Sequence, residues 1–172
     1  MNNSIDYPQF DQSNPESISP AAQAPAPAIG QKLLIVDSRL PDFQKIVDSA
    51  KSDVKVVVID KYSDGLQQLL DVLSKTPDVS ELAIASHGDT GVLLLGATVL
   101  HQGNLAQFQV QLQKIGQLLN TQASIEVFGC KLGAGEAGQM FVNQLASYLG
   151  HQVSASSDDT GDQSHGGDWE LE

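Results

Sequence analysis

Short apolar runs alternate along the chain with segments in which apolar residues recur every three or four positions. The runs are rich in Val and Ile, and their length is typical of strands buried on both faces of a parallel sheet. They cover residues 32–37, 54–60, 81–86, 125–128 and 152–156. The periodic segments predict amphipathic helices that pack on such a sheet. These cover residues 43–50, 66–73, 105–119 and 136–149.

Residues 92–100 depart from both patterns and predict a small β-hairpin that turns at Gly96 and Ala97. Strands and helices otherwise alternate, and Ser63 is expected to cap the second helix. This order predicts an α/β fold with a mainly parallel sheet, helices on both faces and the hairpin as an insertion.

The two ends of the chain differ from the segment between them. Residues 1–29 are rich in Pro, Ala, Ser, Gln and Asn, a composition in which neither helix nor strand persists. We expect a disordered leader or linker there, followed by one domain over residues 30–172. The last residues, from Trp169, have the pattern of a strand in progress, so we expect a fragment of a longer protein. Trp169 itself is expected to cover the core.

Charge and composition exclude several classes of partner. The net charge is −12 and the pI is about 4.4, so the chain lacks the Lys and Arg patches that nucleic acids and anionic membranes require. No apolar run approaches the roughly 18 residues of a membrane span. The first residues lack a basic region followed by an apolar one, so we expect no cleavable secretory signal there, and a signal elsewhere in a longer protein stays open. We therefore predict no nucleic acid partner and no membrane insertion.

The only cysteine, Cys130, follows the fourth predicted strand, and His87 follows the third. Because ligand crevices form at the carboxyl edge of open α/β sheets, we expect these two strand ends to meet there. A neighbouring imidazole and a helix N-terminus both promote ionisation of a thiol. Flanking glycines would let the amides of Gly88 and Cys130 face a developing oxyanion. Taken singly, a cysteine or a histidine is more often structural than catalytic.

Other groups of residues are candidates for nucleotide-binding or metal-binding sites. Residues 133–138 satisfy G-x-G-x-x-G, but Glu136 would place a negative charge where a pyrophosphate binds, so nucleotide binding is only a minor alternative. No histidine has a ligand-like spacing with Cys130, so no metal site is predicted. The carboxylates after Ser157 form by default a solvated loop, and they are also candidates for calcium binding or for the rim of a substrate cleft. They are Asp158, Asp159, Asp162 and Asp168.

The sequence resembles a known family over nearly its whole length from Leu33 to Leu171. It is similar to the domain-of-unknown-function 4347 family, found near the N-termini of very large bacterial surface and adhesin-type repeat proteins. That family lies within the caspase-like cysteine peptidases, which include caspases, gingipains, separases and self-cleaving toxin domains. The resemblance is carried by Leu34-Ile-Val-Asp-Ser-Arg, Ser86-His-Gly, Phe128-Gly-Cys, Gly135-Glu-Ala-Gly and Gly167-Asp-Trp-Glu-Leu.

The resemblance implies a caspase-like sheet and a cysteine endopeptidase without a cofactor. Cys130 would be the nucleophile and His87 the general base. The end of the first strand and the loop after the fifth would form the substrate pocket, which assigns Asp37, Arg39 and Asp158 to it. Asp37 is equally a candidate for a structural carboxylate that accepts backbone amides in its turn. Phe128-Gly-Cys-Lys-Leu replaces the caspase signature Gln-Ala-Cys-Arg-Gly, so specificity for aspartate is not implied.

The family context further implies a polypeptide substrate, which would be the larger bacterial protein that carries the domain, so that the domain would process its own chain. It also implies that this protein is secreted or lies on the cell surface. A non-catalytic folding or interaction module of a large adhesin-type protein is the main alternative.

Overall fold

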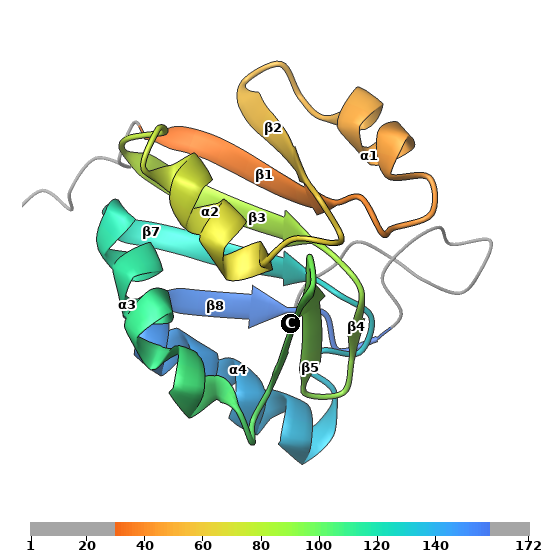
Figure 1. The fold of residues 1–172 in the computed structure, drawn as a ribbon, viewed down its shortest axis with the longest axis vertical. Helices are drawn as coiled ribbons and strands as arrows, with labels where there is room; N and C mark the ends of the chain where they lie inside the picture. Colours follow the sequence, from red (N-terminus) through yellow and green to blue (C-terminus); the bar gives the residue numbers. More distant parts are fainter. Residues whose placement is uncertain (1–29, 159–172) are drawn as a thin grey trace, which may run out of the picture.

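The structure is a computed structural model, and it describes residues 30–158. The expected leader and the expected strand around Trp169 lie outside these residues. Five parallel strands form one sheet in the order β2-β1-β3-β7-β8 (Figure 1). Their bounds are β1 Gln31–Asp37, β2 Val54–Ile59, β3 Val79–Ala85, β7 Leu119–Phe128 and β8 Gln152–Ala155. The predicted mainly parallel α/β fold is confirmed.

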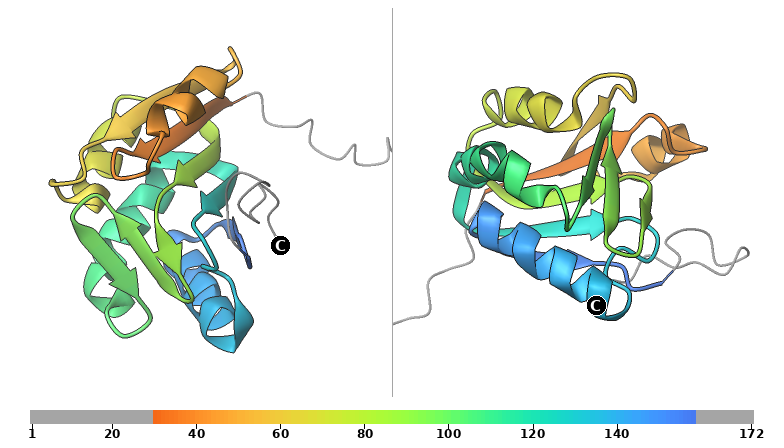
Figure 2. Two further views of the ribbon diagram at one scale, coloured as in Figure 1. Left: turned by 90° about the vertical axis from the view of Figure 1, so that its right-hand side faces the viewer. Right: turned by 60° about the horizontal axis from the view of Figure 1, so that its bottom comes forward.

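Helices cover the two faces of this sheet unequally (Figures 1 and 2). Three helices lie side by side on one face, and a short helix lies on the other. The three are α2 Gly65–Leu73, α3 Gln109–Leu118 and α4 Gly135–Leu149; a 3-10 turn, η1 Leu105–Phe108, leads into α3. The short helix is α1 Phe43–Ser49, none of whose residues is buried. Because side chains alternate along a strand, β3 sends Leu82 and Ile84 toward the three helices and Ala85 toward α1.

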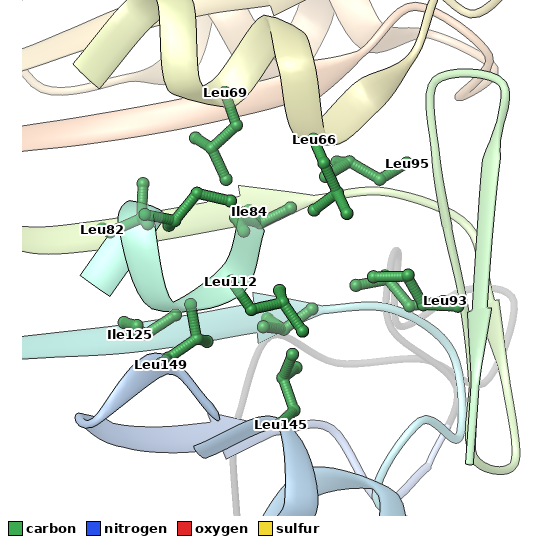
Figure 3. Close-up of a pocket in the computed structure, with 13 residues that line it drawn as sticks. Leu66, Leu69, Leu82, Ile84, Leu93, Leu95, Leu112, Ile125, Leu145 and Leu149 are labelled. Atoms are coloured by element: carbon green, nitrogen blue, oxygen red, sulfur yellow. The ribbon is translucent and has the colours of Figure 1, made fainter. Parts of the chain in front are cut away.

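The main hydrophobic core lies between the sheet and the three helices. Leucines of α2, α3 and α4 meet Leu82, Ile84 and Ile125 of the strands and enclose an apolar cavity of about 20 Å³ (Figure 3). Leu93 and Leu95 close one end of this core from the neighbouring hairpin. The core therefore links the parallel sheet to the predicted insertion.

The insertion is a three-stranded antiparallel sheet at the carboxyl ends of the parallel strands (Figure 1). Its strands are β4 Gly88–Asp89, β5 Val92–Leu95 and β6 Thr98–His101. The turn between β5 and β6 falls at Gly96 and Ala97, which confirms the predicted hairpin. Gly96 has φ +56°, and a methyl group on it would lie 2.4 Å from the carbonyl oxygen of Ser63, so glycine is required here for two reasons.

Local details differ from the sequence predictions at two places. The N-cap of α2 is Asp64, whose carboxylate accepts a hydrogen bond from the Gln67 amide, because the Ser63 hydroxyl donates to Asp60 instead. Strand β7 begins at Leu119 rather than at Ile125, since Leu119 pairs with Val79 before the register shifts.

Candidate functional site

The ends of β3 and β7 lie side by side at the carboxyl edge. The Ser86 amide donates a hydrogen bond of 3.0 Å to the Phe128 carbonyl, one residue beyond the end of β3. A methyl group on Gly88 would lie 3.0 Å from the carbonyl carbon of Gly129 and 3.2 Å from the carbonyl oxygen of Cys130. The two glycines thus allow the segments that carry His87 and Cys130 to approach closely.

His87 is held on its other side by the hairpin. Its carbonyl oxygen accepts a hydrogen bond of 3.0 Å from the Leu94 amide, and the Ser86 hydroxyl donates to the Leu94 carbonyl. The backbone around His87 is therefore fixed between β7 and β5, while its side chain remains partly exposed.

Cys130 lies at the start of a loop that is hydrogen-bonded to two surrounding segments. The amides of Lys131 and Gly133 donate to the carbonyls of Asp158 and Ser156 after β8, at 2.6 and 2.9 Å. On the opposite side, the Gly91 amide of the β4–β5 turn donates to the Leu132 carbonyl at 3.0 Å. The residue Cys130 is partly exposed at this junction. Cys130 is therefore carried by a backbone that is fixed by hydrogen bonds from its neighbours in the loop.

Lys131, directly after the cysteine, adopts the left-handed backbone region with φ +56°. This conformation costs a non-glycine residue about 1 kcal/mol or more and persists only where the surroundings impose it. The hydrogen bond from its amide to Asp158 is one such constraint. Asp42 and Asp78 share this conformation away from the loop, so it does not by itself mark the loop as functional.

Asp37, at the end of β1, is fully buried. One carboxylate oxygen accepts the Arg39 amide at 2.8 Å, and the other accepts the Gly96 amide at 2.7 Å. These are the contacts of a structural carboxylate that accepts backbone amides, one of the two interpretations left open by the sequence. The carboxylate is not presented to solvent, so a substrate cation would not reach it in this arrangement.

The other two predicted pocket residues are exposed at the same edge of the sheet. The guanidinium of Arg39 donates to the carbonyls of Lys61 and Gly96, at 2.8 and 2.9 Å. Asp158 is exposed, and its carbonyl accepts the Lys131 amide next to Cys130. Asp159, Asp162 and Asp168 lie outside the described residues.

Sequence reasoning gave no role to two serines of this edge. Ser86 belongs to the Ser86-His-Gly motif, and its buried hydroxyl donates a hydrogen bond to the Leu94 carbonyl of the hairpin. Ser156, after β8, is fully buried, and its hydroxyl has no hydrogen-bond partner within residues 30–158. A buried hydroxyl without a partner is uncommon and marks a place where a water or a ligand group would bind. The sequence does not reveal the hydrogen-bonding role of either serine, because that role depends on distant segments.

A groove of about 460 Å³ lies on the α1 face and reaches the strand ends. Its floor contains Leu34, Ala85 and Phe128, and α1 forms its wall with Ile46. Ala85 and Phe128 are the last residues of β3 and β7, so the groove opens beside the segments that carry His87 and Cys130.

The glycine-rich motif at residues 133–138 has a packing role. A methyl group on Gly138 would lie 2.4 Å from the carbonyl carbon of Gly133, so the first turn of α4 rests directly on the loop. Glu136 is exposed in that turn. Close packing therefore accounts for Gly138 without a nucleotide.

Residues 30–158 contain neither a metal-ligand cluster nor a membrane-spanning helix. No group of three or more His, Cys, Asp or Glu residues in this range is placed to hold a metal ion. No helix in the range is long and apolar enough to cross a bilayer.

Comparisons with known proteins give one family and distant structural neighbours. The family described as "Domain of unknown function (DUF4347)" matches residues 33–172. No curated protein matches the chain. A diflavin flavoprotein A3 from Nostoc sp. is 15% identical over 77% of this chain and 79% of its own, with a TM-score of 0.37. An aromatic-amino-acid aminotransferase from Burkholderia pseudomallei is 12% identical over 73% of this chain and 31% of its own, with a TM-score of 0.38.

Proposed function

Because the chain belongs to the DUF4347 family and the strand ends that carry Cys130 and His87 lie side by side, we propose that it is a caspase-like cysteine endopeptidase domain. The observation that carries the proposal is the contact between the two ends: Ser86 is hydrogen-bonded to Phe128, and Gly88 lies against Gly129. Reactive thiols need a neighbouring base, and the contact between the two strand ends supports His87, which follows β3, as the base for Cys130, the only cysteine of the chain.

The proposed reaction proceeds through a covalent intermediate. His87 accepts the thiol proton as the Cys130 sulfur attacks the scissile carbonyl, and the amides of Gly88 and Cys130 stabilise the oxyanion. The C–N bond then breaks, His87 gives its proton to the leaving amine, and a thioester remains on the sulfur. Water hydrolyses the thioester, which releases the carboxylate and restores the thiol.

We propose the polypeptide that carries this domain as the substrate, within a larger bacterial surface or secreted repeat protein. The family resemblance supports this context. Arg39 and Asp158 are exposed at the carboxyl edge of the sheet, and we propose that they contact the substrate chain. The groove beside Phe128 offers an apolar surface at the same edge.

Cleavage can be tested in the full-length protein. We expect a fragment to appear on incubation of the parent protein and to be absent from Cys130→Ala and His87→Ala, since each variant lacks one of the two reacting groups. Met140→Ala is the control, because Met140 is exposed on α4. A fragment that forms equally in Cys130→Ala would refute the proposal.

A second test uses labelling by a peptide-based thiol reagent. The chain has one cysteine, so every label reports Cys130. Labelling that depends on His87 supports the dyad. Labelling at the same rate in His87→Ala would instead favour the non-catalytic module.

A further inference from the structure

Asp37 is the one charged side chain that is buried within residues 30–158. Its two oxygens accept backbone amides from different parts of the chain, Arg39 in its own turn and Gly96 in the hairpin 59 residues away. No Lys or Arg in the described part of the chain forms an ion pair with it. A buried carboxylate that accepts two backbone amides and the Ser86 hydroxyl holds these donors tightly, because a hydrogen bond to a carboxylate is stronger than one between neutral groups.

The hairpin that Asp37 holds is also the hairpin that holds His87. Two residues before Gly96, the Leu94 amide donates to the His87 carbonyl at 3.0 Å. The Leu94 carbonyl accepts the Ser86 hydroxyl, whose oxygen lies 3.4 Å from Asp37. Asp37 and Ser86 therefore bind β5 on both sides of Leu95.

Further contacts make the turn of the hairpin rigid. The Arg39 guanidinium binds the Gly96 carbonyl, and the Ala97 amide donates to the Ser63 carbonyl at 2.8 Å. Because the turn is fixed, a displacement of Asp37 would be transmitted along β5 to the backbone of His87.

We propose that Asp37 is a positioning residue for His87, acting through Gly96 and β5, and that it does not belong to a substrate pocket. This inference rests on the proposed function, since it assigns Asp37 a role toward the same histidine. A carboxylate is required because both partners are donors. Asparagine would keep one oxygen and turn an NH2 group toward the other amide.

The test is the rate at which iodoacetamide alkylates Cys130 at neutral pH in four variants of the full chain. We expect His87→Ala to slow alkylation by about tenfold or more, the scale of a positioned base. Asp37→Asn should slow it by about fivefold, within the usual coupling of residues in one hydrogen-bond network. Asp53→Asn, at an exposed carboxylate, should leave the rate unchanged. Circular dichroism checks that each variant is folded.

The double variant His87→Ala/Asp37→Asn separates positioning from a general structural effect. If Asp37 acts through His87, the second substitution adds nothing once the histidine is gone. An equal further slowing would overturn the inference. So would a normal rate in Asp37→Asn when His87→Ala is slow. No effect of His87→Ala would refute the proposed function itself.

Ser86→Ala provides the same test if Asp37→Asn does not fold. It removes the hydroxyl that links Asp37 to the Leu94 carbonyl of β5, and it leaves the Asp37 contacts to Arg39 and Gly96 in place. We expect a slowing of about twofold or more that again vanishes in the His87→Ala background. An unchanged rate in a folded Ser86→Ala protein would overturn the proposed path through β5.

Discussion

The two faces of the parallel sheet differ in how completely helices cover them. On one face, α2, α3 and α4 bury a continuous layer of Leu, Ile and Phe side chains. On the other, α1 contributes no buried residue, and strand side chains such as Val58 and Glu126 are exposed. The first face holds only a 20 Å³ cavity, whereas the second holds a 460 Å³ groove.

One face of the sheet is therefore expected to stabilise the fold, and the other leaves the candidate site open to solvent. Hydrophobic burial is the main favourable term in folding, so the three-helix face should carry most of the folding free energy. The α1 face can then stay open beside the strand ends that carry Cys130 and His87. Substitutions on the two faces should therefore differ in cost, and the following experiments measure that difference.

The largest loss is expected from Phe141→Ala. Phe141 of α4 is fully buried in the core, and a Phe→Ala change at such a site costs about 3–5 kcal/mol. Urea unfolding followed by circular dichroism measures the change. The neighbouring Met140, 48% exposed, is the matched control, and its replacement by Ala should cost no more than about 0.5 kcal/mol. Similar losses for both variants would contradict the burial of this helix face.

Gly116→Ala should destabilise the protein, although a Gly→Ala substitution within a helix usually stabilises it. Alanine normally stabilises an exposed helix interior by about 0.5–1 kcal/mol relative to glycine. Here the added methyl group would lie 1.8 Å from the Leu149 carbonyl oxygen, so α3 and α4 would have to separate. We expect a loss of about 1–3 kcal/mol from overpacking, measured by thermal unfolding. A stabilised Gly116→Ala protein would show that the two helices are not in such close contact.

Ile46→Ala tests the open face. Ile46 of α1 is partly exposed on the wall of the groove, so only part of its side chain leaves water on folding. A loss of about 1 kcal/mol follows from that partial burial. Urea unfolding under the conditions used for Phe141→Ala allows direct comparison. A cost equal to that of Phe141→Ala would mean that both faces contribute alike.

The smallest effect is expected from an ionic cluster on the edge of the open face. Lys32 lies 3.4 Å from Glu81 and 3.5 Å from Asp53. A side-chain hydrogen bond to Glu81 and the charge of Glu81, followed by that of Asp53, raise the pKa of Lys32 above its usual value of 10.5. The stabilisation is therefore fully present below that value and is lost as the pH rises through the higher folded-state pKa.

We expect the urea midpoint of the parent to fall more steeply above about pH 10 than that of Lys32→Met, which lacks the titrating group. Added salt should weaken the difference, because the three groups are exposed. Lys51→Met, at an exposed lysine, should retain the slope of the parent. Identical slopes for Lys32→Met and the parent would contradict the assignment.

Most elements of the fold could be predicted because their signals are local. Apolar runs such as residues 54–60 predict strands whatever surrounds them, and Gly96 and Ala97 mark the hairpin turn. The N-cap was misassigned because Ser63 and Asp64 are both good caps, and only the contact of Ser63 with Asp60 decides between them. The early start of β7 was missed because Leu119 is extended through its pairing with Val79.

The candidate site was predictable only in part. The sequence placed His87 and Cys130 after parallel strands, which already confined them to one edge of the sheet. It left open whether Asp37 faces a substrate or the backbone, because an aspartate at a strand end looks the same in both cases. The contact with Gly96, far along the chain, distinguishes the two.

The sequence by itself determined which segments are strands and helices, and that one thiol and one imidazole follow strands of the same sheet. Only the tertiary structure decided that β3 and β7 are neighbours, that Asp37 is enclosed by the hairpin, and that one face of the sheet is covered more fully than the other. The reason is physical: local patterns reflect the burial of a segment's own side chains, whereas strand order and the burial of a carboxylate depend on contacts between residues distant in the chain.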